Sequence, residues 1–329
     1  MKDVMKLKVT QWLDNIMEFA VQRQASDVFI LPKENEYCIK VHTAIRTIQI
    51  TNLSTEMAKR VISYCKYQSG MSVTDSRRPQ LGAMDYTIKD QKLRLRLSSV
   101  GNFSQNESMV IRIIYDTHQI ESGFFNPDQI QKIESACKKR GLLLFAGPTG
   151  SGKTTTIYRV VRKISKNQIV MTIEDPVEIY EESFLQLEVN DQAKMTYADL
   201  LKAGLRQRPD VFIIGEIRDH QTAEVAISAA LSGHLVLSTV HAKSPDGTIQ
   251  RLLELGIDFE RIQAALNLVV YQRLIPTKSK EIKTLLTIKD EFNNHHVEKD
   301  DMEDWKDQIE LLFKRGVISE KNRDKYFYG

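Results

Sequence analysis

The second half of the chain alternates between short apolar runs and segments in which apolar positions have helical spacing. The apolar runs are residues 142–146, 169–174, 211–214 and 235–240. Each run has the length of a buried strand rather than of a buried helix. Short apolar strands separated by helices are typical of an α/β domain with a mostly parallel sheet. We therefore expect such a domain over residues 128–276.

The first part of the chain has a different pattern. Residues 9–23 carry apolar side chains at helical spacing, which predicts an amphipathic helix. Residues 92–98 alternate strictly between polar and apolar positions, which predicts a half-buried strand. These patterns predict a small α+β domain over residues 1–118.

Two further segments fit neither domain. In the first of them, Gly123, Asn126 and Pro127 are residues that commonly interrupt helices and strands. We therefore place a linker at residues 119–127 and expect a hinge at residues 120–128. Residues 277–329 are rich in charges of both signs, but an apolar helical face runs from Trp305 to Phe313. This pattern predicts a charged, exposed helical tail that docks partly on the second domain.

Composition restricts the possible classes of protein. A length of 329 residues suits about two domains, and a net charge of +3 gives no strong nucleic-acid footprint. The three cysteines are far apart, which favours buried thiols over a disulfide framework or a zinc site. The first residues are too polar for a signal peptide, and no apolar stretch approaches the roughly 18 residues of a membrane span. Any membrane association is expected to be peripheral or through a partner.

Residues 147–155 match the phosphate-binding pattern G-x-x-x-x-G-K-[ST]. A predicted strand precedes them and a predicted helix follows, which is the context that this loop requires. The loop amides and Lys153 can hold the β- and γ-phosphates of ATP, and the Thr154 hydroxyl can hold Mg²⁺. The residues expected to bind nucleotide are Gly147, Pro148, Thr149, Gly150, Ser151, Gly152, Lys153, Thr154 and Thr155.

Three other polar clusters follow predicted strands. Glu174 and Glu178 lie at the end of one strand, Glu216 ends the next and His241 follows a third. Each cluster taken alone is more often a solvated turn or a structural histidine. Together with the phosphate loop they favour catalysis, with carboxylates that position Mg²⁺ or water. We assign Glu216 to the Mg²⁺ shell and the attacking water, Glu178 or Glu174 to a supporting role, and His241 to sensing the γ-phosphate.

The four clusters resemble the Walker A, Asp box, Walker B and His box of the ATPase superfamily of type II secretion and type IV pilus assembly. The resemblance extends from Ala25 to Leu274 and includes Ala-Ser-Asp at residues 25–27, Arg-Pro-Gln-Leu-Gly at 78–82 and Gln-Arg-Leu at 272–274. It implies a PAS-like N-terminal domain joined to a RecA-like P-loop ATPase domain. It also implies a homo-hexamer with ATP at subunit boundaries, where Arg96 and Arg112 stabilise the phosphates.

Departures from the family pattern narrow the resemblance. The chain lacks the four-cysteine zinc insert of many members, so no zinc is expected. Phe29 replaces a histidine of the family pattern, Arg208 replaces an aspartate, and an arginine expected near Ala83 is missing. The compact form is most similar to the competence pilus ATPases of Gram-positive bacteria.

That similarity implies a cytoplasmic motor for DNA uptake, bound peripherally to the membrane through a polytopic platform protein. Pilin-like subunits would be indirect partners, and no direct contact with nucleic acid is expected. Three alternatives stay open: a pilus retraction ATPase, a RecA-like motor acting on nucleic acid, and a nucleotide-gated scaffold without turnover.

Overall fold

The computed structural model describes residues 2–43, 46–89, 91–115, 123–190, 195–292 and 302–329. The chain forms two compact units, residues 1–120 and residues 121–329, and each is described by itself. In the described ranges, no helix has both the length and the apolar character needed to cross a membrane.

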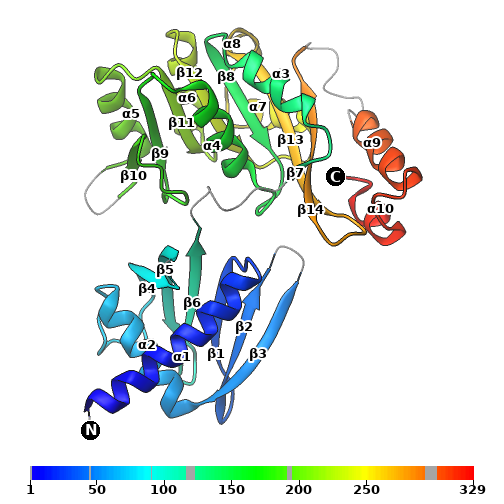
Figure 1. The fold of residues 1–329 in the computed structure, drawn as a ribbon. Helices are drawn as coiled ribbons and strands as arrows, with labels where there is room; N and C mark the ends of the chain where they lie inside the picture. Colours follow the sequence, from blue (N-terminus) through cyan, green and yellow to red (C-terminus); the bar gives the residue numbers. More distant parts are fainter. Residues whose placement is uncertain (1, 44–45, 90, 116–122, 191–194, 293–301) are drawn as a thin grey trace. The chain divides into compact units, whose positions relative to one another are not determined.

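The first unit is a six-stranded antiparallel sheet with two helices (Figure 1). Its strand order is β3-β2-β1-β6-β5-β4. The elements are α1 (Lys2–Gln22), β1 (Asp27–Pro32), β2 (Glu36–His42), β3 (Thr47–Ser54), α2 (Thr55–Gln68), β4 (Gln80–Ile88), β5 (Gln91–Gly101) and β6 (Glu107–Ile114).

Alternation along β5 decides which face of this sheet is covered. Leu93, Leu95 and Leu97 are buried and belong to one core with the apolar faces of α1 and α2. Arg94 and Arg96 lie between them and point to the opposite face. The expected helix at residues 9–23 is present as part of α1, which begins earlier and ends at Gln22, and the expected strand at residues 92–98 lies within β5.

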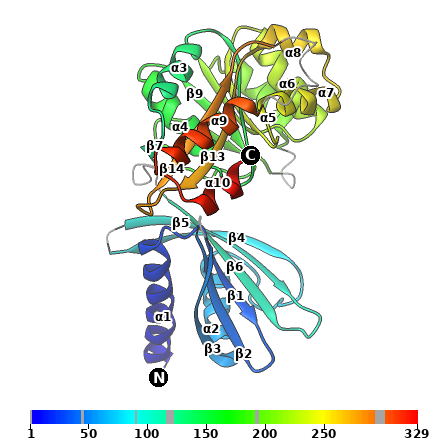
Figure 2. The same ribbon diagram turned by 90° about the vertical axis from the view of Figure 1, so that its right-hand side faces the viewer.

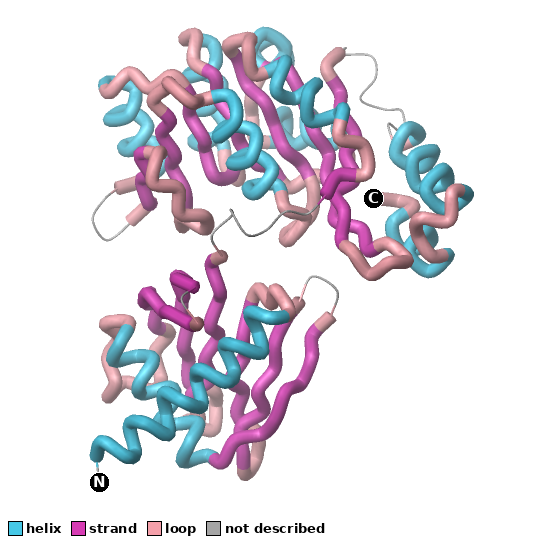
Figure 3. The backbone as a smooth tube through the Cα atoms, viewed as in Figure 1, coloured by secondary structure: helices cyan, strands magenta, loops and turns pink. Residues whose placement is uncertain are grey.

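The second unit contains an eight-stranded mixed sheet of order β10-β9-β11-β12-β8-β13-β14-β7. Its strands are β7 (Gly123–Phe124), β8 (Gly141–Ala146), β9 (Val170–Glu174), β10 (Leu185–Glu188), β11 (Val211–Glu216), β12 (Leu235–Val240), β13 (Leu266–Pro276) and β14 (Ile282–Lys289). The pairings from β10 to β13 are all parallel, and β14 runs antiparallel to β13. Figure 3 shows the strands of this sheet in magenta, with helices in cyan beside them. The four apolar runs of the sequence are four adjacent inner strands, β9, β11, β12 and β8.

Helices cover both faces of this sheet. They are α3 (Asp128–Ala136), α4 (Lys153–Ile164), α5 (Tyr197–Arg206), α6 (His220–Leu231), α7 (Pro245–Glu254), α8 (Phe259–Ala265), α9 (Glu303–Lys314) and α10 (Glu320–Tyr326). In β8, Leu143 and Phe145 pack with α3 and α4, whereas Leu142 and Leu144 belong to the core of the other helices. The central strand is therefore buried on both sides, which explains its uninterrupted apolar run.

The last segment differs from the expected helical tail. Residues 282–289 form β14, which extends the sheet beyond residue 276, where the core was expected to end. Helices α9 and α10 are present, but Trp305 is fully buried and donates its indole N–H to the carbonyl oxygen of Tyr326 at 2.8 Å. Figure 2 shows both helices in front of β13 and β14. The charged side chains of α9 and α10 are exposed or partly exposed, so these two helices form a docked layer with a charged outer surface.

The expected linker falls partly outside the described residues, as do residues 120–122 of the expected hinge. In its described part, Gly123 and Phe124 form β7, which pairs with β14. The side chain of Asn126 accepts the backbone N–H of Asp128 at the start of α3. Gly123 and Asn126, which the sequence analysis assigned to a linker, therefore belong to the second unit. Gly123 lies in an edge strand, and Asn126 caps the start of a helix.

Candidate functional site

The predicted site residues of the second unit converge because their strands are parallel neighbours. In the sheet, β9 pairs with β11, β11 with β12, and β12 with β8. Carboxyl ends of parallel strands meet at one edge, and ligands of such sheets bind there. The phosphate loop follows β8 at this edge, beside Glu174, Glu216 and His241 at the ends of the neighbouring strands.

The phosphate loop has a backbone that depends on its glycines. Gly147 adopts a φ of +139°, and a Cβ there would lie 2.4 Å from the backbone oxygen of Gln272. Gly152 caps α4 in the left-handed region and supplies no side chain to the helix N-terminus. The first amides of α4 thus lack a side-chain cap, which suits an anion at the positive end of the helix dipole.

Lys153 is buried and folds over its own loop. Its ammonium donates to the carbonyl oxygens of Gly147 at 2.8 Å and Pro148 at 3.0 Å. Burial lowers the pKa of Lys153 to about 8, although the carboxylates of Glu216 and Glu178 act in the opposite direction. A buried cation beside uncapped helix amides fits a phosphate ligand.

Gln272 of β13 supports the loop from behind. Its side-chain amide donates to the carbonyl oxygen of Ser151 at 2.7 Å, and the residue is almost fully buried. The other amide atom, Oε1, is buried without a hydrogen-bond partner, as is Oγ of Ser151. Buried polar atoms of this kind are costly unless a ligand or water satisfies them.

Glu174 is buried at the end of β9. The phenol of Tyr158, on α4, donates to its Oε1 at 2.5 Å. Burial raises the pKa of Glu174, while the hydrogen bond from Tyr158 lowers it. Glu178 is exposed, and its backbone N–H donates to the Glu174 carboxylate. Of the two, Glu178 has the solvent access that contact with water or Mg²⁺ requires.

Glu216 is redirected by a bulge at the end of β11. The β11–β12 register shifts between Ile214 and Glu216, and the Thr239 hydroxyl donates to the carbonyl oxygen of Gly215 at 2.6 Å. The Glu216 carboxylate lies 3.4 Å from Nε2 of His241, and both side chains are partly exposed. This pair joins two of the predicted clusters in a single contact.

In the described part of the chain, no group of three or more His, Cys, Asp or Glu side chains is arranged to hold a metal ion. Magnesium in phosphoryl-transfer sites is usually held by one or two protein oxygens together with substrate phosphates. Thr154, in the first turn of α4, and Glu216 are oxygen donors at this edge of the sheet. The residues present therefore fit Mg²⁺ bound with a nucleotide.

Three residues near the site were not predicted as site residues from the sequence. Tyr158 and Gln272 bond to Glu174 and to the phosphate loop, as described above, and Arg218 pairs with Asp175 at 2.5 Å. Gln272 appeared only as part of a motif. Arg218 lies two positions after Glu216, and this proximity could have indicated that it belongs to the site. Nothing in the sequence indicates which acidic residue it pairs with.

Arg96 and Arg112 belong to the first unit. They are register partners on β5 and β6, and Asp27 of β1 is the register partner of Arg112 on its other side. The guanidinium of Arg112 donates to the Asp27 carboxylate at 2.9 Å. Two arginines from separate segments thus share one sheet face, and their role toward the phosphate loop stays a prediction.

Comparison with known proteins identifies the family of this chain. A family model described as "Type II/IV secretion system protein" matches residues 4–309. The competence protein ComGA of Streptococcus pneumoniae is 39% identical over 311 residues, which cover 94% of this chain and 96% of that protein. The type IV pilus assembly ATPase PilB of Pseudomonas aeruginosa is 33% identical, over 81% of this chain and 48% of its own length.

Solved structures share the fold. The ATPase DotB of Legionella pneumophila has a TM-score of 0.75 at 22% identity and covers 95% of this chain and 94% of its own. The pilus retraction motor PilT has a TM-score of 0.69 at 23% identity, covering 95% of this chain and 96% of its own. The match over most of the length, together with the phosphate loop, Glu216 and His241, shows that this chain belongs to the type II/IV secretion system protein family and is an ATPase of that family.

Proposed function

We propose that this ATPase is a motor that drives assembly of a competence type IV pilus for DNA uptake. The observation that carries the proposal is the contact of Glu216 with His241 at the ends of β11 and β12, on one side of the phosphate loop that follows β8. The names of the relatives support the pilus role, since ComGA is a competence protein and PilB a type IV pilus assembly ATPase.

In this proposal the phosphate loop holds the β- and γ-phosphates. Its backbone amides and the Lys153 ammonium compensate negative charge, and Gln272 fixes the loop in the receptive conformation. Mg²⁺, when bound, neutralises charge on the phosphates, and Thr154 and Glu216 would be its ligands from the protein. Ser151 and Gln272 each have a buried polar atom that lacks a partner, which supports completion of the loop by a ligand.

The exposed carboxylates then act on water. Glu216 orients the attacking water, and Glu178 assists from the end of β9, where Glu174 holds the Glu178 backbone. His241 lies against Glu216, which supports its proposed role in sensing the γ-phosphate. Positioning and electrostatic stabilisation are nearly everything that a protein supplies to phosphoryl transfer.

The larger assembly is also part of the proposal. The first unit would be a PAS-like domain and the second a RecA-like domain, arranged in a homo-hexamer. Arg96 and Arg112 would stabilise phosphate charge at subunit boundaries. The motor would work in the cytoplasm, held at the membrane by a polytopic platform protein that links it to pilin-like subunits.

ATP turnover by the purified full-length chain tests the enzymatic part. We expect Mg²⁺-dependent hydrolysis that falls by about 10²-fold or more in Lys153→Ala and in Glu216→Gln. Lys202→Ala, at an exposed position of α5, serves as the matched control and is expected to keep full activity. Wild-type turnover in either site variant would overturn the assignment.

A deletion strain tests the direction of the motor. Loss of pili and of DNA uptake on deletion supports assembly, and return of both with the wild-type gene but not with Lys153→Ala links them to hydrolysis. Excess pili on deletion would instead indicate a retraction motor.

A further inference from the structure

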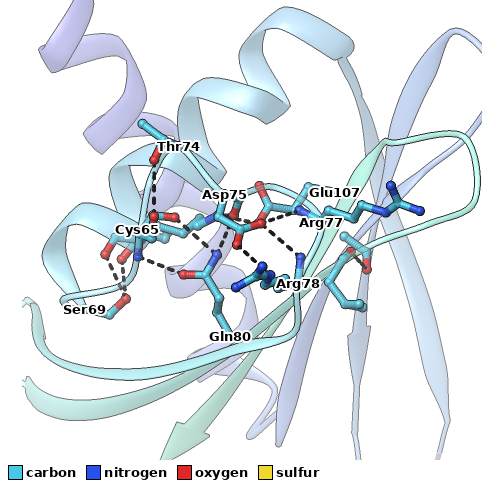
Figure 4. Close-up of polar contacts among 12 residues, drawn as sticks. Cys65, Ser69, Thr74, Asp75, Arg77, Arg78, Gln80 and Glu107 are labelled. Atoms are coloured by element: carbon cyan, nitrogen blue, oxygen red, sulfur yellow. Dashed lines mark hydrogen bonds and ion pairs between the residues drawn. The ribbon is translucent and has the colours of Figure 1, made fainter.

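The loop between α2 and β4 holds its own backbone through side-chain hydrogen bonds (Figure 4). Gln80 accepts the backbone N–H of Ser72 at 2.8 Å and donates to the carbonyl oxygen of Asp75 at 2.5 Å. The Asp75 carboxylate accepts the backbone N–H groups of Arg77 and Arg78, and these bonds lower the pKa of Asp75. The loop therefore has a defined conformation without any partner.

A buried ion pair fixes this loop to the body of the first unit. The ammonium of Lys66 lies 2.6 Å from the Glu107 carboxylate and donates to the carbonyl oxygen of Asp75 at 2.6 Å. Lys66 is completely buried. Burying a charged pair carries a desolvation penalty, so it is a poor source of stability but can specify one arrangement. Here it joins α2, the loop and β6.

The loop also packs closely against the end of β5. The backbone N–H of Gly101 donates to the carbonyl oxygen of Arg77 at 3.2 Å. A Cβ at Gly101 would lie 2.5 Å from the carbonyl oxygen of Ser76, so any larger residue would displace the loop. The end of β5, the turn that follows it and the loop are consequently one continuous surface.

This end of the first unit exposes large apolar side chains. They are Tyr67, Val73, Leu81, Val100 and Phe103. Three of them are strongly exposed: Tyr67 at 75%, Leu81 at 82% and Phe103 fully. Within the described part of the first unit, exposed large hydrophobic side chains occur only at this end, on the last turn of α2, the loop, β4, β5 and the turn after β5. Clustered exposed apolar residues mark interaction sites more often than scattered ones do.

The charge of the same surface is positive. Arg77 and Arg78 are both exposed, and the Arg78 side chain keeps 86% of its accessible area. Of the neighbouring acids, Glu107 binds Lys66, and Asp75 accepts backbone amides and also lies 3.8 Å from the Arg78 guanidinium in an ion pair that leaves the Arg78 side chain exposed. Two guanidinium groups thus emerge from a fixed backbone at the same end of the first unit as the exposed apolar side chains. A Cβ at Gly82 would meet Ser69 at the end of α2, so the adjacent Leu81 points to the face of the sheet opposite α2 and Tyr67.

We propose that this loop surface docks an acidic segment with apolar side chains from another protein. The planar guanidinium group of arginine can bind a carboxylate through two parallel hydrogen bonds. Tyrosine and arginine are also enriched among the interface residues that contribute most to binding energy. A loop that is already ordered loses little conformational entropy on binding. The inference rests on the chemistry of this surface and not on the roles proposed at the ATP site.

Other occupants fit the surface less well. A symmetric contact with a second copy would place like charges opposite one another, which is unfavourable. A head-to-tail contact in the proposed ring would instead set this surface against a different face of the neighbouring subunit, and sedimentation equilibrium tests that case. Attraction to anionic lipid usually takes clusters of four to eight basic residues, and this loop supplies two arginines. Both occupants remain measurable outcomes of the test.

The test uses the full-length protein and a labelled peptide in which glutamate alternates with leucine and phenylalanine. Fluorescence anisotropy measures its binding to wild type, to R77E/R78E and to the apolar variant L81S/F103S. The matched control is K138E/K139E, a reversal of two adjacent exposed lysines in the second unit. Liposomes of phosphatidylglycerol and sedimentation equilibrium are run in parallel.

We expect peptide binding that weakens at least tenfold in both loop variants and that also weakens at high salt, while K138E/K139E binds like wild type. All variants should keep wild-type ATP turnover, so failure of this proposal is distinct from failure of the proposed function. Equal peptide binding by wild type and R77E/R78E would overturn it. So would liposome binding in place of peptide binding, or self-association, as a dimer or as a larger ring, that the loop variants abolish.

Discussion

The side chain of Gln272 donates a hydrogen bond to the backbone carbonyl oxygen of Ser151, with 2.7 Å between nitrogen and oxygen. The bond ties β13 to a loop 121 positions earlier in the chain. On the same strand, Tyr271 stacks edge-to-face on Trp305 of α9, with ring centroids 5.1 Å apart. One strand therefore contacts both the phosphate loop and the last helical layer.

Replacing Gln272 with alanine should weaken nucleotide binding more than it slows chemistry. The Ser151 carbonyl would lose its buried donor, which costs about 1–3 kcal/mol and corresponds to about tenfold or more in affinity. We expect a raised KM for ATP with a smaller change in kcat, measured by steady-state kinetics. Gln221→Ala, on the exposed side of α6, is the control. A change in kcat alone would contradict a role in positioning the loop.

Nucleotide affinity should depend on pH through Lys153. Burial lowers its pKa to about 8, and only the ammonium can pair with phosphate. Binding above pH 8 must therefore take up a proton, so the Kd should be constant below pH 7.5 and rise about tenfold per pH unit above 8.5. Calorimetry in buffers of different ionisation enthalpy measures both quantities. Lys153→Arg should remove the pH dependence, and a flat profile in wild type would exclude this explanation.

The same group affects the stability of the nucleotide-free protein in the opposite direction. Its pKa is about 8 when folded and 10.5 as a free side chain. Between these values the unfolded state binds more protons, so the contribution of Lys153 to the free energy of unfolding increases with pH. Urea denaturation at pH 8 and pH 10, compared between wild type and Lys153→Met, isolates this contribution.

Removing the Tyr158 hydroxyl should shift the pH profile of turnover. The phenol lowers the pKa of Glu174, which burial raises. Tyr158→Phe should therefore raise that pKa and move the acidic limb of the kcat profile to higher pH. An unchanged limb at full activity would mean that ionised Glu174 is not required for turnover.

The Lys66–Glu107 pair should show the asymmetry of buried charges. Lys66→Met leaves the Glu107 carboxylate buried without its partner and should destabilise the first unit by about 3–5 kcal/mol. The double replacement K66M/E107L removes both charges and should recover most of that loss. Chemical denaturation of the three proteins measures the coupling, and additive effects would show that the pair is not coupled.

The central strands of the second unit could be predicted because burial on both faces leaves apolar runs with turn residues at their ends. Strand β13 was missed since its apolar residues directly continue the helical pattern of α8. Strand β14 was hidden in a segment rich in charge. Four of its residues are almost fully buried, but two of them, Thr284 and Thr287, are polar, so that only Leu285 and Leu286 give an apolar signal in the strand.

The candidate site was predictable to a similar degree. Residues at strand ends could be assigned because parallel strands bring their carboxyl ends together. The burial of Glu174 could not be predicted, because it depends on the Tyr158 side chain, which extends to Glu174 from α4. The contact of Gln272 with the phosphate loop likewise depends on pairing between β8 and β13, which the sequence pattern does not specify.

The parallel register also has a consequence for protein engineering. The connections that enter β8, β9, β11 and β12 lie at the opposite edge of the sheet from the phosphate loop, Glu216 and His241. If new chain ends were opened in one of these connections, each site residue would stay covalently continuous with the strand that it follows. The turn at residues 166–168, between α4 and β9, is therefore a suitable position for new chain ends in a circular permutant. Such a permutant changes the order of the elements along the chain without cutting the segments that carry the nucleotide site.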